Sequence, residues 1–267
     1  DVGAVGRRHY FVMEYVDGTD VHELLKKESK LSERRGLEII QEIALALQHA
    51  HGKGFLHRDI KPRNIMITKA GVAKLADLGL ARHVDDTETA EAEKNKAFGT
   101  PFYISPEQIR GKMDIAAPAD IYGLGATFYH MVTGKVPFTG ANPKEVMKAH
   151  LKEELVPPDH LNSDLSSGCA QIIEHMLARR VEDRYHSADD LLIDLELVMQ
   201  GLPPKFARSG LDASVLAETA AAAAAATAIP TQVAKPTVAS APPTWMIAAL
   251  VGSLFVNLLL FILYLLK

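Results

Sequence analysis

The carboxyl-terminal part of the chain contains the feature that most limits its fold, a run from Trp245 to Leu266 without a charged residue. These 22 residues would span about 33 Å as an α-helix, against about 30 Å of hydrocarbon in a bilayer. Trp245 and Tyr264 stand near the two ends of the run, where aromatic rings favour the membrane interface. The pattern predicts a transmembrane helix over residues 245–266, in contact with membrane lipid.

Residues 203–244 differ in composition from the residues before them. They contain Pro203-Pro204, an uninterrupted run of alanines at 220–226 and Pro242-Pro243, with few large apolar side chains. Such a segment has too little apolar surface to form a core, and its prolines favour an extended chain. We therefore predict an Ala/Pro-rich linker over 203–244 and a globular part that ends near Leu202.

The globular part shows the mixture of apolar patterns that is typical of a mostly helical α+β domain. Ser32 precedes apolar residues at helical spacing, which predicts a helix from Glu33 to about His51. Residues 10–16 are aromatic and β-branched and predict a strand that stops at Asp17-Gly18. Short strands at 64–67 and 73–77 are expected to form a hairpin. Further helices are expected at 118–134, 142–152, 166–178 and 187–200.

Composition argues against several classes of function. The formal net charge of -4 provides no positive field for nucleic acid, so we expect no nucleic-acid partner. Cys169 is the single cysteine, which rules out an internal disulfide and fits a reducing, cytoplasmic setting for the globular part. His49 and His51 end the first long helix without a nearby carboxylate in the sequence, and we expect them to be exposed and not to bind metal.

The stretch LHRDIKPRN, residues 56–64, places Asp59 among several cations, with the amide Asn64 beyond it. Its spacing resembles the catalytic loop of the protein kinases. The resemblance implies that Asp59 accepts the proton of a substrate hydroxyl, that Lys61 neutralises phosphate charge and that Asn64 holds Mg²⁺. ADLGLA resembles the metal-binding DFG motif, with Asp77 as the metal ligand and Leu78 where Phe is usual. Phosphoryl transfer needs these groups because its reactants are held in line by charge and position.

Motifs farther along the chain extend the resemblance. GTPFYISPE, residues 99–107, resembles the segment that closes the kinase activation loop. There Thr100 would face the catalytic loop, which points to serine or threonine substrates. Glu107 would form a buried ion pair with Arg184, as the family's pattern implies. Asp120 resembles the helix aspartate that accepts hydrogen bonds from the catalytic-loop backbone.

The segment FVMEYVDG, residues 11–18, resembles the kinase hinge. The Glu14 carbonyl and the Val16 amide would bind the adenine edge of ATP, and Met66 would form the floor beneath it. The resemblance covers about residues 1–200 and implies ATP and Mg²⁺ as cofactors. It divides the chain into the last small-lobe strands and hinge at 1–18, a kinase large lobe at 19–202, the linker at 203–244 and the transmembrane helix at 245–266.

The family's phosphate-binding elements are not found ahead of this hinge. The residues before Met13 contain no G-x-G-x-x-G and no lysine, so we expect the chain alone to bind ATP poorly and to transfer phosphate negligibly. The favoured interpretation is a piece of a membrane-tethered Ser/Thr kinase that resembles the bacterial receptor type, with a single membrane pass and a cytoplasmic lobe. The alternative is a membrane-anchored pseudokinase or binding module without catalysis. Coding sequence upstream of Asp1 would distinguish the two.

Thr87 and Thr89 lie in the expected activation loop and are candidate phosphorylation sites. Arg58 beside Asp59 is typical of kinases in which a phosphate orders this loop. A solvated acidic loop is the alternative, because acidic residues surround both threonines. The sequence implies protein substrates that bear Ser or Thr, and it leaves open which proteins these are, what signal activates the chain and whether it forms a homodimer.

Overall fold

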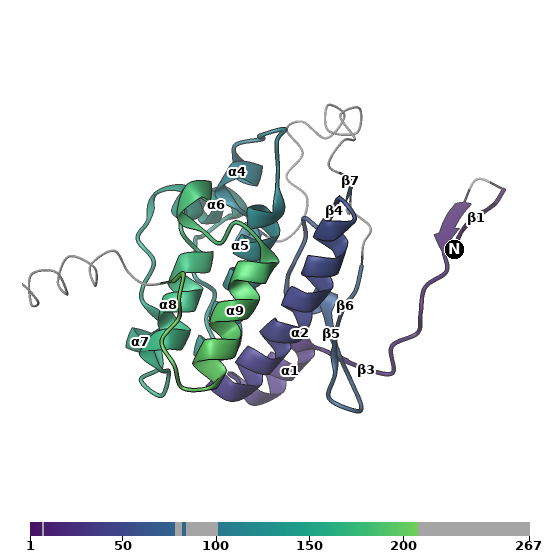
Figure 1. The fold of residues 1–267 in the computed structure, drawn as a ribbon. Helices are drawn as coiled ribbons and strands as arrows, with labels where there is room; N and C mark the ends of the chain where they lie inside the picture. Colours follow the sequence, from purple (N-terminus) through teal and green to yellow (C-terminus); the bar gives the residue numbers. More distant parts are fainter. Residues whose placement is uncertain (7, 78–81, 84–100, 208–267) are drawn as a thin grey trace, which may run out of the picture. The chain divides into compact units, whose positions relative to one another are not determined.

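Helices dominate the residues that the computed structural model describes, which are 1–6, 8–77, 82–83 and 101–207 (Figure 1). The helices are α1 Val21–Glu28, α2 Glu33–Gly52, α4 Pro106–Ile109, α5 Ala117–Thr133, α6 Pro143–Lys152, α7 Pro158–Leu161, α8 Ser167–Met176 and α9 Ala188–Met199, with short 3-10 helices η1 Pro62–Asn64, η3 Pro101–Tyr103 and η4 Val181–Asp183. The strands are β1 Val2–Val5, β2 Arg8–Phe11, β3 Gly18–Asp20, β4 Phe55–Leu56, β5 Ile65–Thr68, β6 Ala73–Leu75 and β7 Arg82–His83. Within these ranges, no helix has the length and apolar character that crossing a membrane requires. The predicted span 245–266 lies outside them.

Helix α2 begins and ends where the sequence predicts. The Ser32 side chain accepts a hydrogen bond from the Arg35 amide at 3.3 Å and so satisfies an amide that the helix itself leaves unpaired. Gly54, just beyond the helix, has a φ of 77°, a conformation that glycine adopts without steric cost. The apolar face of α2 packs against α5, α9 and β6. The predicted helix is confirmed.

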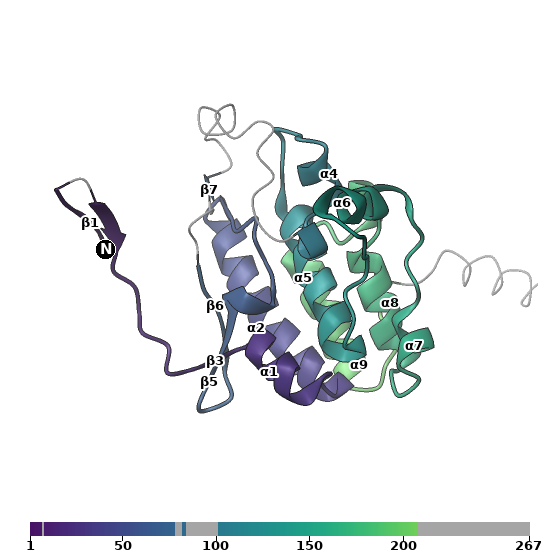
Figure 2. The same ribbon diagram turned by 180° about the vertical axis from the view of Figure 1, so that it is seen from behind.

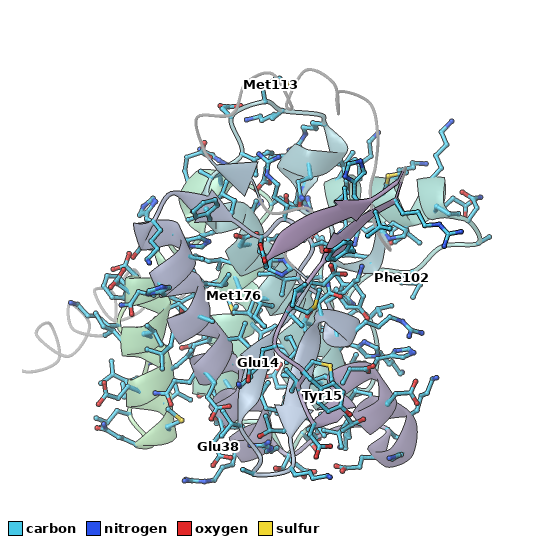
Figure 3. All side chains as sticks on the ribbon, turned by 90° about the vertical axis from the view of Figure 1, so that its right-hand side faces the viewer. Glu14, Tyr15, Glu38, Phe102, Met113 and Met176 are labelled. Carbon is cyan, nitrogen blue, oxygen red and sulfur yellow. The ribbon has the colours of Figure 1, made fainter. Side chains whose placement is uncertain are left out.

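Helix α5 lies at the centre of the helical packing, and the view from behind in Figure 2 shows it between α2 and α8. Most of its side chains are buried, because other elements cover it on several sides. At Gly125 the α8 backbone comes so close that an added Cβ would lie 2.6 Å from the Met176 Cβ. Met176 is labelled in Figure 3 and is fully buried. A residue without a side chain is therefore required at this crossing.

Strands β3, β5 and β6 form an antiparallel sheet in that order, with β5 in the middle. The pairs Ile65 with Leu75 and Ile67 with Ala73 set the register of the predicted hairpin, which is confirmed. Ile65 and Ile67 are buried in the core, and Met66 between them points to the opposite face and is half-buried. The hairpin thus presents an apolar face to the core, and its opposite face carries Met66 across from Lys74.

The strand expected at 10–16 is shorter and lies earlier in the chain. Strand β2 pairs with β1 and ends at Phe11, and the last bond of the ladder joins the Val12 amide to the Asp1 carbonyl at 2.8 Å. Among the described residues, none faces 13–17 as a strand partner, so apolar composition alone does not make a strand there. Gly18 was predicted to end a strand, but it begins β3 instead.

The packed part of the chain continues beyond Leu202, where it was expected to end. The Asp194 carboxylate accepts hydrogen bonds from the backbone amides of Lys205, Phe206 and Ala207, at 2.6 to 3.1 Å. It also accepts the Tyr185 hydroxyl at 2.8 Å. Because a buried carboxylate needs such donors, α9 holds the segment that follows it. Composition indicated a linker at 203–207, but this side chain attaches those residues to the core.

Candidate active site

The three predicted catalytic-loop residues lie together between β4 and β5. The Lys61 Nζ atom lies 2.5 Å from Asp59 Oδ2, and both side chains are largely buried, at 17% and 15% exposure. The Asn64 amide nitrogen donates to the Asp59 backbone carbonyl at 2.8 Å and to its Oδ2 at 3.2 Å. One carboxylate is thus held by an ammonium and an amide, a geometry that fixes where a substrate hydroxyl could approach it.

Asp77 is brought beside Asn64 by the register of the β5–β6 hairpin. Asn64 directly precedes β5, and Ala76 directly follows β6. The Ala76 amide donates to the Asn64 carbonyl at 2.8 Å, which continues the ladder and puts Asp77 next to it. Asp77 is exposed and has a φ of 64°. A non-glycine residue in this left-handed region is strained by about 1–3 kcal/mol, and such strain often occurs at functional sites.

His57 joins the catalytic loop to the Asp77 segment, a role that the sequence analysis did not assign. Its Nδ1 atom accepts the Asp59 amide at 3.3 Å, so Nε2 must bear the hydrogen of the neutral ring. That Nε2 lies 3.1 Å from the Ala76 carbonyl, and the residue is buried. The histidine of the HRD triplet was visible in the sequence, but its two partners depend on how β4 and β6 are placed.

Asp120 on α5 holds the backbone of the catalytic loop. Its carboxylate oxygens accept the His57 amide at 2.9 Å and the Arg58 amide at 2.7 Å, as expected from the sequence. His51 Nε2 lies 2.8 Å from the same carboxylate. The expectation that His51 is exposed was therefore wrong, since its side chain is only 12% exposed. Arg58 has a φ of 66°, so Asp120 also stabilises a strained turn beside Asp59.

The pair predicted between Glu107 and Arg184 is present and buried. The two guanidinium Nη atoms lie 2.7 and 2.9 Å from the two carboxylate oxygens. Ser105, which precedes α4, forms a capping box with Gln108, and Gln108 Nε2 donates to the Arg58 carbonyl at 2.8 Å. Helix α4 is therefore tied both to the core through Arg184 and to the catalytic loop through Gln108.

The residues predicted to bind adenine lie near the outer face of the three-stranded sheet. The Glu14 side chain is 2.5 Å from Lys74 Nζ, opposite Met66 in the β5–β6 register. Figure 3 labels Glu14 and its neighbour Tyr15 in front of these strands, and Tyr15 is 85% exposed. Val16 is half-buried. Within the described ranges, neither the Glu14 carbonyl nor the Val16 amide is hydrogen-bonded to another residue.

Several predicted site residues lie outside the described residues. They are Leu78, Thr87, Thr89 and Thr100. In the described part, no group of three or more His, Cys, Asp and Glu side chains could hold a metal ion. Asn64 still fits a Mg²⁺ site with Asp77, because its amide nitrogen is used by Asp59 and its carbonyl oxygen is the atom left to bind a hard cation.

Comparison with known families agrees with this geometry. The model of the protein kinase domain matches residues 4–194. The chain belongs to the protein kinase family. The matched kinase domain includes the catalytic loop, the Asp77 segment, α4 and α5.

Three relatives of this kinase domain come from bacteria. The serine/threonine-protein kinase PknB of Mycobacterium tuberculosis is 37% identical over 196 residues, which cover 73% of this chain and 31% of the relative. A probable serine/threonine-protein kinase of Clostridium acetobutylicum is 37% identical over 198 residues, which cover 74% of this chain and 30% of the relative. PknB of Mycobacterium leprae is 35% identical over 202 residues, which cover 76% of this chain and 32% of the relative. The chain thus spans about a third of the length of these relatives.

Proposed function

We propose that the protein is a serine/threonine kinase that transfers the γ-phosphoryl group of ATP to protein hydroxyls. The observation that carries the proposal is the contact of Asp59 with Lys61 and Asn64, beside a hairpin that puts Asp77 next to Asn64. Family membership and the names of the relatives support it.

The roles follow from the groups that the residues carry. Asp59 accepts the proton of the substrate Ser or Thr hydroxyl as that oxygen bonds to the γ-phosphorus and the bond to the bridging oxygen breaks. Lys61 lies against the same carboxylate and neutralises developing negative charge. Asn64 and Asp77 would hold Mg²⁺, which when bound offsets the charge of the phosphates. The Glu14 carbonyl, the Val16 amide and the Met66 side chain would bind the adenine.

A phosphorylation assay tests this proposal. The protein is purified at the length made by its native cells and incubated with radiolabelled ATP, Mg²⁺ and casein as a general acceptor. We expect label on Ser and Thr, lowered at least about a hundredfold by Asp59→Asn, because a general base contributes at least that factor. Asp164→Asn is the matched control, since this side chain is 87% exposed. Absence of Mg²⁺-dependent transfer, or equal transfer by Asp59→Asn, would overturn the proposal.

We further propose that residues 245–266 anchor the protein in a membrane, with the kinase domain on the cytoplasmic side where ATP is found. The support is the uncharged run of 22 residues and its aromatic ends. In membranes washed with alkaline carbonate, the full chain should stay in the pellet and a chain that ends at residue 244 should be released. Release of the full chain would contradict the anchor.

A further inference from the structure

The last turn of α2 brings a histidine to the helix that supports the catalytic loop. His51 lies at the carboxyl end of α2, and its side chain is 12% exposed. Its Nε2 atom lies 2.8 Å from Oδ2 of the buried Asp120 on α5, a helix that packs beside α2 (Figure 2). An ionised carboxylate only accepts hydrogen bonds, so His51 Nε2 bears the hydrogen that joins the two side chains.

The same carboxylate also accepts hydrogen bonds from the catalytic loop. Asp120 Oδ2 lies 2.9 Å from the His57 amide nitrogen, and Oδ1 lies 2.7 Å from the Arg58 amide nitrogen. The two oxygens must therefore point at successive amides at once. The terminal torsion of an aspartate is broad, and the two amides belong to the loop that the carboxylate has to hold. Among the described residues, His51 is the side chain that donates to this carboxylate, and it does so from a different element.

The position of Asp59 depends on these two amides. Arg58 has a φ of 66°, a conformation that residues other than glycine rarely adopt, so the turn needs support from outside the loop. The next amide, that of Asp59, donates to His57 Nδ1 at 3.3 Å. Three successive amides are thus held, the first two by Asp120 and the third by the His57 ring. A rotation of the Asp120 carboxylate would weaken the first two hydrogen bonds and move the backbone directly before Asp59.

The second nitrogen of the His51 ring adds no hydrogen bond within the described part of the chain. Its Nδ1 atom is buried and has no partner there. A buried polar atom without a partner lowers stability, and an apolar side chain of similar size would avoid that loss. What a histidine supplies at this position, and an apolar side chain cannot, is the hydrogen bond to Asp120.

We propose that His51 is a positioning residue for phosphoryl transfer: its Nε2–H fixes the Asp120 carboxylate, which holds the His57 and Arg58 amides and so sets the place of Asp59. The inference rests on the proposed kinase function and concerns the base of the same site. It assigns no contact between His51 and either reactant, because the hydrogen bond of the ring is made to α5.

Substitutions at position 51 separate the hydrogen bond from the volume of the ring. His51→Leu and His51→Ala both remove the N–H donor, whereas His51→Gln keeps one. The matched control is His49→Leu, because His49 is an exposed histidine two positions earlier in the same helix. The control for general loss of stability is Leu195→Ala, at a fully buried position of α9.

The casein assay is run on the protein as its native cells make it, well below the Tm of each variant. We expect His51→Leu and His51→Ala to lower kcat about tenfold to a hundredfold, since a misplacement of about 1 Å can cost about a hundredfold in rate. The KM values for ATP and casein should change less than about threefold, because the lost contact is to neither reactant. His51→Gln should recover kcat toward the wild type, and His49→Leu and Leu195→Ala should keep it.

Hydrogen exchange of the His57 and Arg58 amides supplies a second measurement. These amides should exchange faster in His51→Leu than in Leu195→Ala, because Asp120 holds them less firmly. A kcat unchanged in His51→Leu and His51→Ala, lowered equally in Leu195→Ala, or not recovered in His51→Gln would overturn the inference while leaving the kinase function intact. Absence of phosphoryl transfer by the wild type would instead overturn the proposed function, and this inference with it.

Discussion

Removal of Glu107 should destabilise the kinase domain more than the loss of any exposed ion pair. Arg184 has no exposed side-chain surface, and Glu107 is 5% exposed. Besides the carboxylate, the guanidinium donates to the backbone carbonyls of Ala178 at 2.6 Å, Pro118 at 3.1 Å and Arg179 at 3.2 Å. Glu107→Ala would leave the positive charge of Arg184 buried, with two of its N–H groups unpaired.

The magnitude follows from burial. Breaking a buried pair by removing one partner costs about 3–5 kcal/mol, because the remaining charge has lost its compensation. An exposed pair contributes at most about 1 kcal/mol, and the pair of Lys69 with Asp17, exposed by 79% and 58%, supplies the comparison. For a domain of this size each kcal/mol shifts Tm by about 2–4 °C. We therefore expect Glu107→Ala to lower Tm by about 6–20 °C and Lys69→Ala by less than about 4 °C.

Thermal unfolding followed by circular dichroism, with all proteins in the same detergent at pH 7, measures these shifts. The double variant Glu107→Leu, Arg184→Met should recover part of the loss, since it removes both charges and leaves only neutral carbonyls without their donor. The reasoning would be refuted if Glu107→Ala lowered Tm no more than Lys69→Ala, or if the double variant were less stable than the single one.

Two further predictions concern the helical core. Gly125→Ala should destabilise the protein by about 1–3 kcal/mol through overpacking, because the new Cβ would lie 2.6 Å from the Met176 Cβ. The control is Gly52→Ala, where an added Cβ meets nothing within 4 Å. Equal Tm values for the two variants would contradict the predicted clash. Burial lowers the pKa of His150 on α6 to about 4, against about 6.5 when unfolded, so the unfolded chain binds the proton first as pH falls. The contribution of neutral His150 to the free energy of unfolding is therefore complete above pH about 6.5 and is lost as the pH falls toward 4. Between pH 7 and pH 5 the loss is about 2 kcal/mol. His150→Leu should therefore flatten the fall of Tm between those values, and an unchanged slope would show that another group is responsible.

Local features of the sequence predicted local structure well. Ser32 and the apolar spacing after it placed the start of α2, because a helix needs a cap and a continuous apolar face. The hairpin of β5 and β6 followed from two short apolar runs around a glycine turn. The strand expected at 10–16 was wrong in its extent, since a strand also needs a partner across the ladder, and composition does not say whether one is present.

The candidate site was predictable in its members but not in all of its contacts. The spacing of Asp59, Asn64 and Asp77 matched a known motif, and the motif supplied their proposed roles. His51 was expected to be exposed because its sequence neighbours include no carboxylate, yet Asp120 reaches it from α5. In the same way, the prolines after Leu202 indicated a linker, whereas Asp194 binds the amides of 205–207.

The sequence by itself determined which residues are proposed to carry the chemistry, where the main helices begin and end, and which faces are apolar. Tertiary structure alone decided which of these faces meet, and with them the partners of His57, Asp194 and His51. The physical reason is that periodicity specifies the side of an element that must leave water, while many partners could cover that side equally well. Only the packing of the helices around α5 selects one of them and brings side chains from distant parts of the chain within hydrogen-bonding distance.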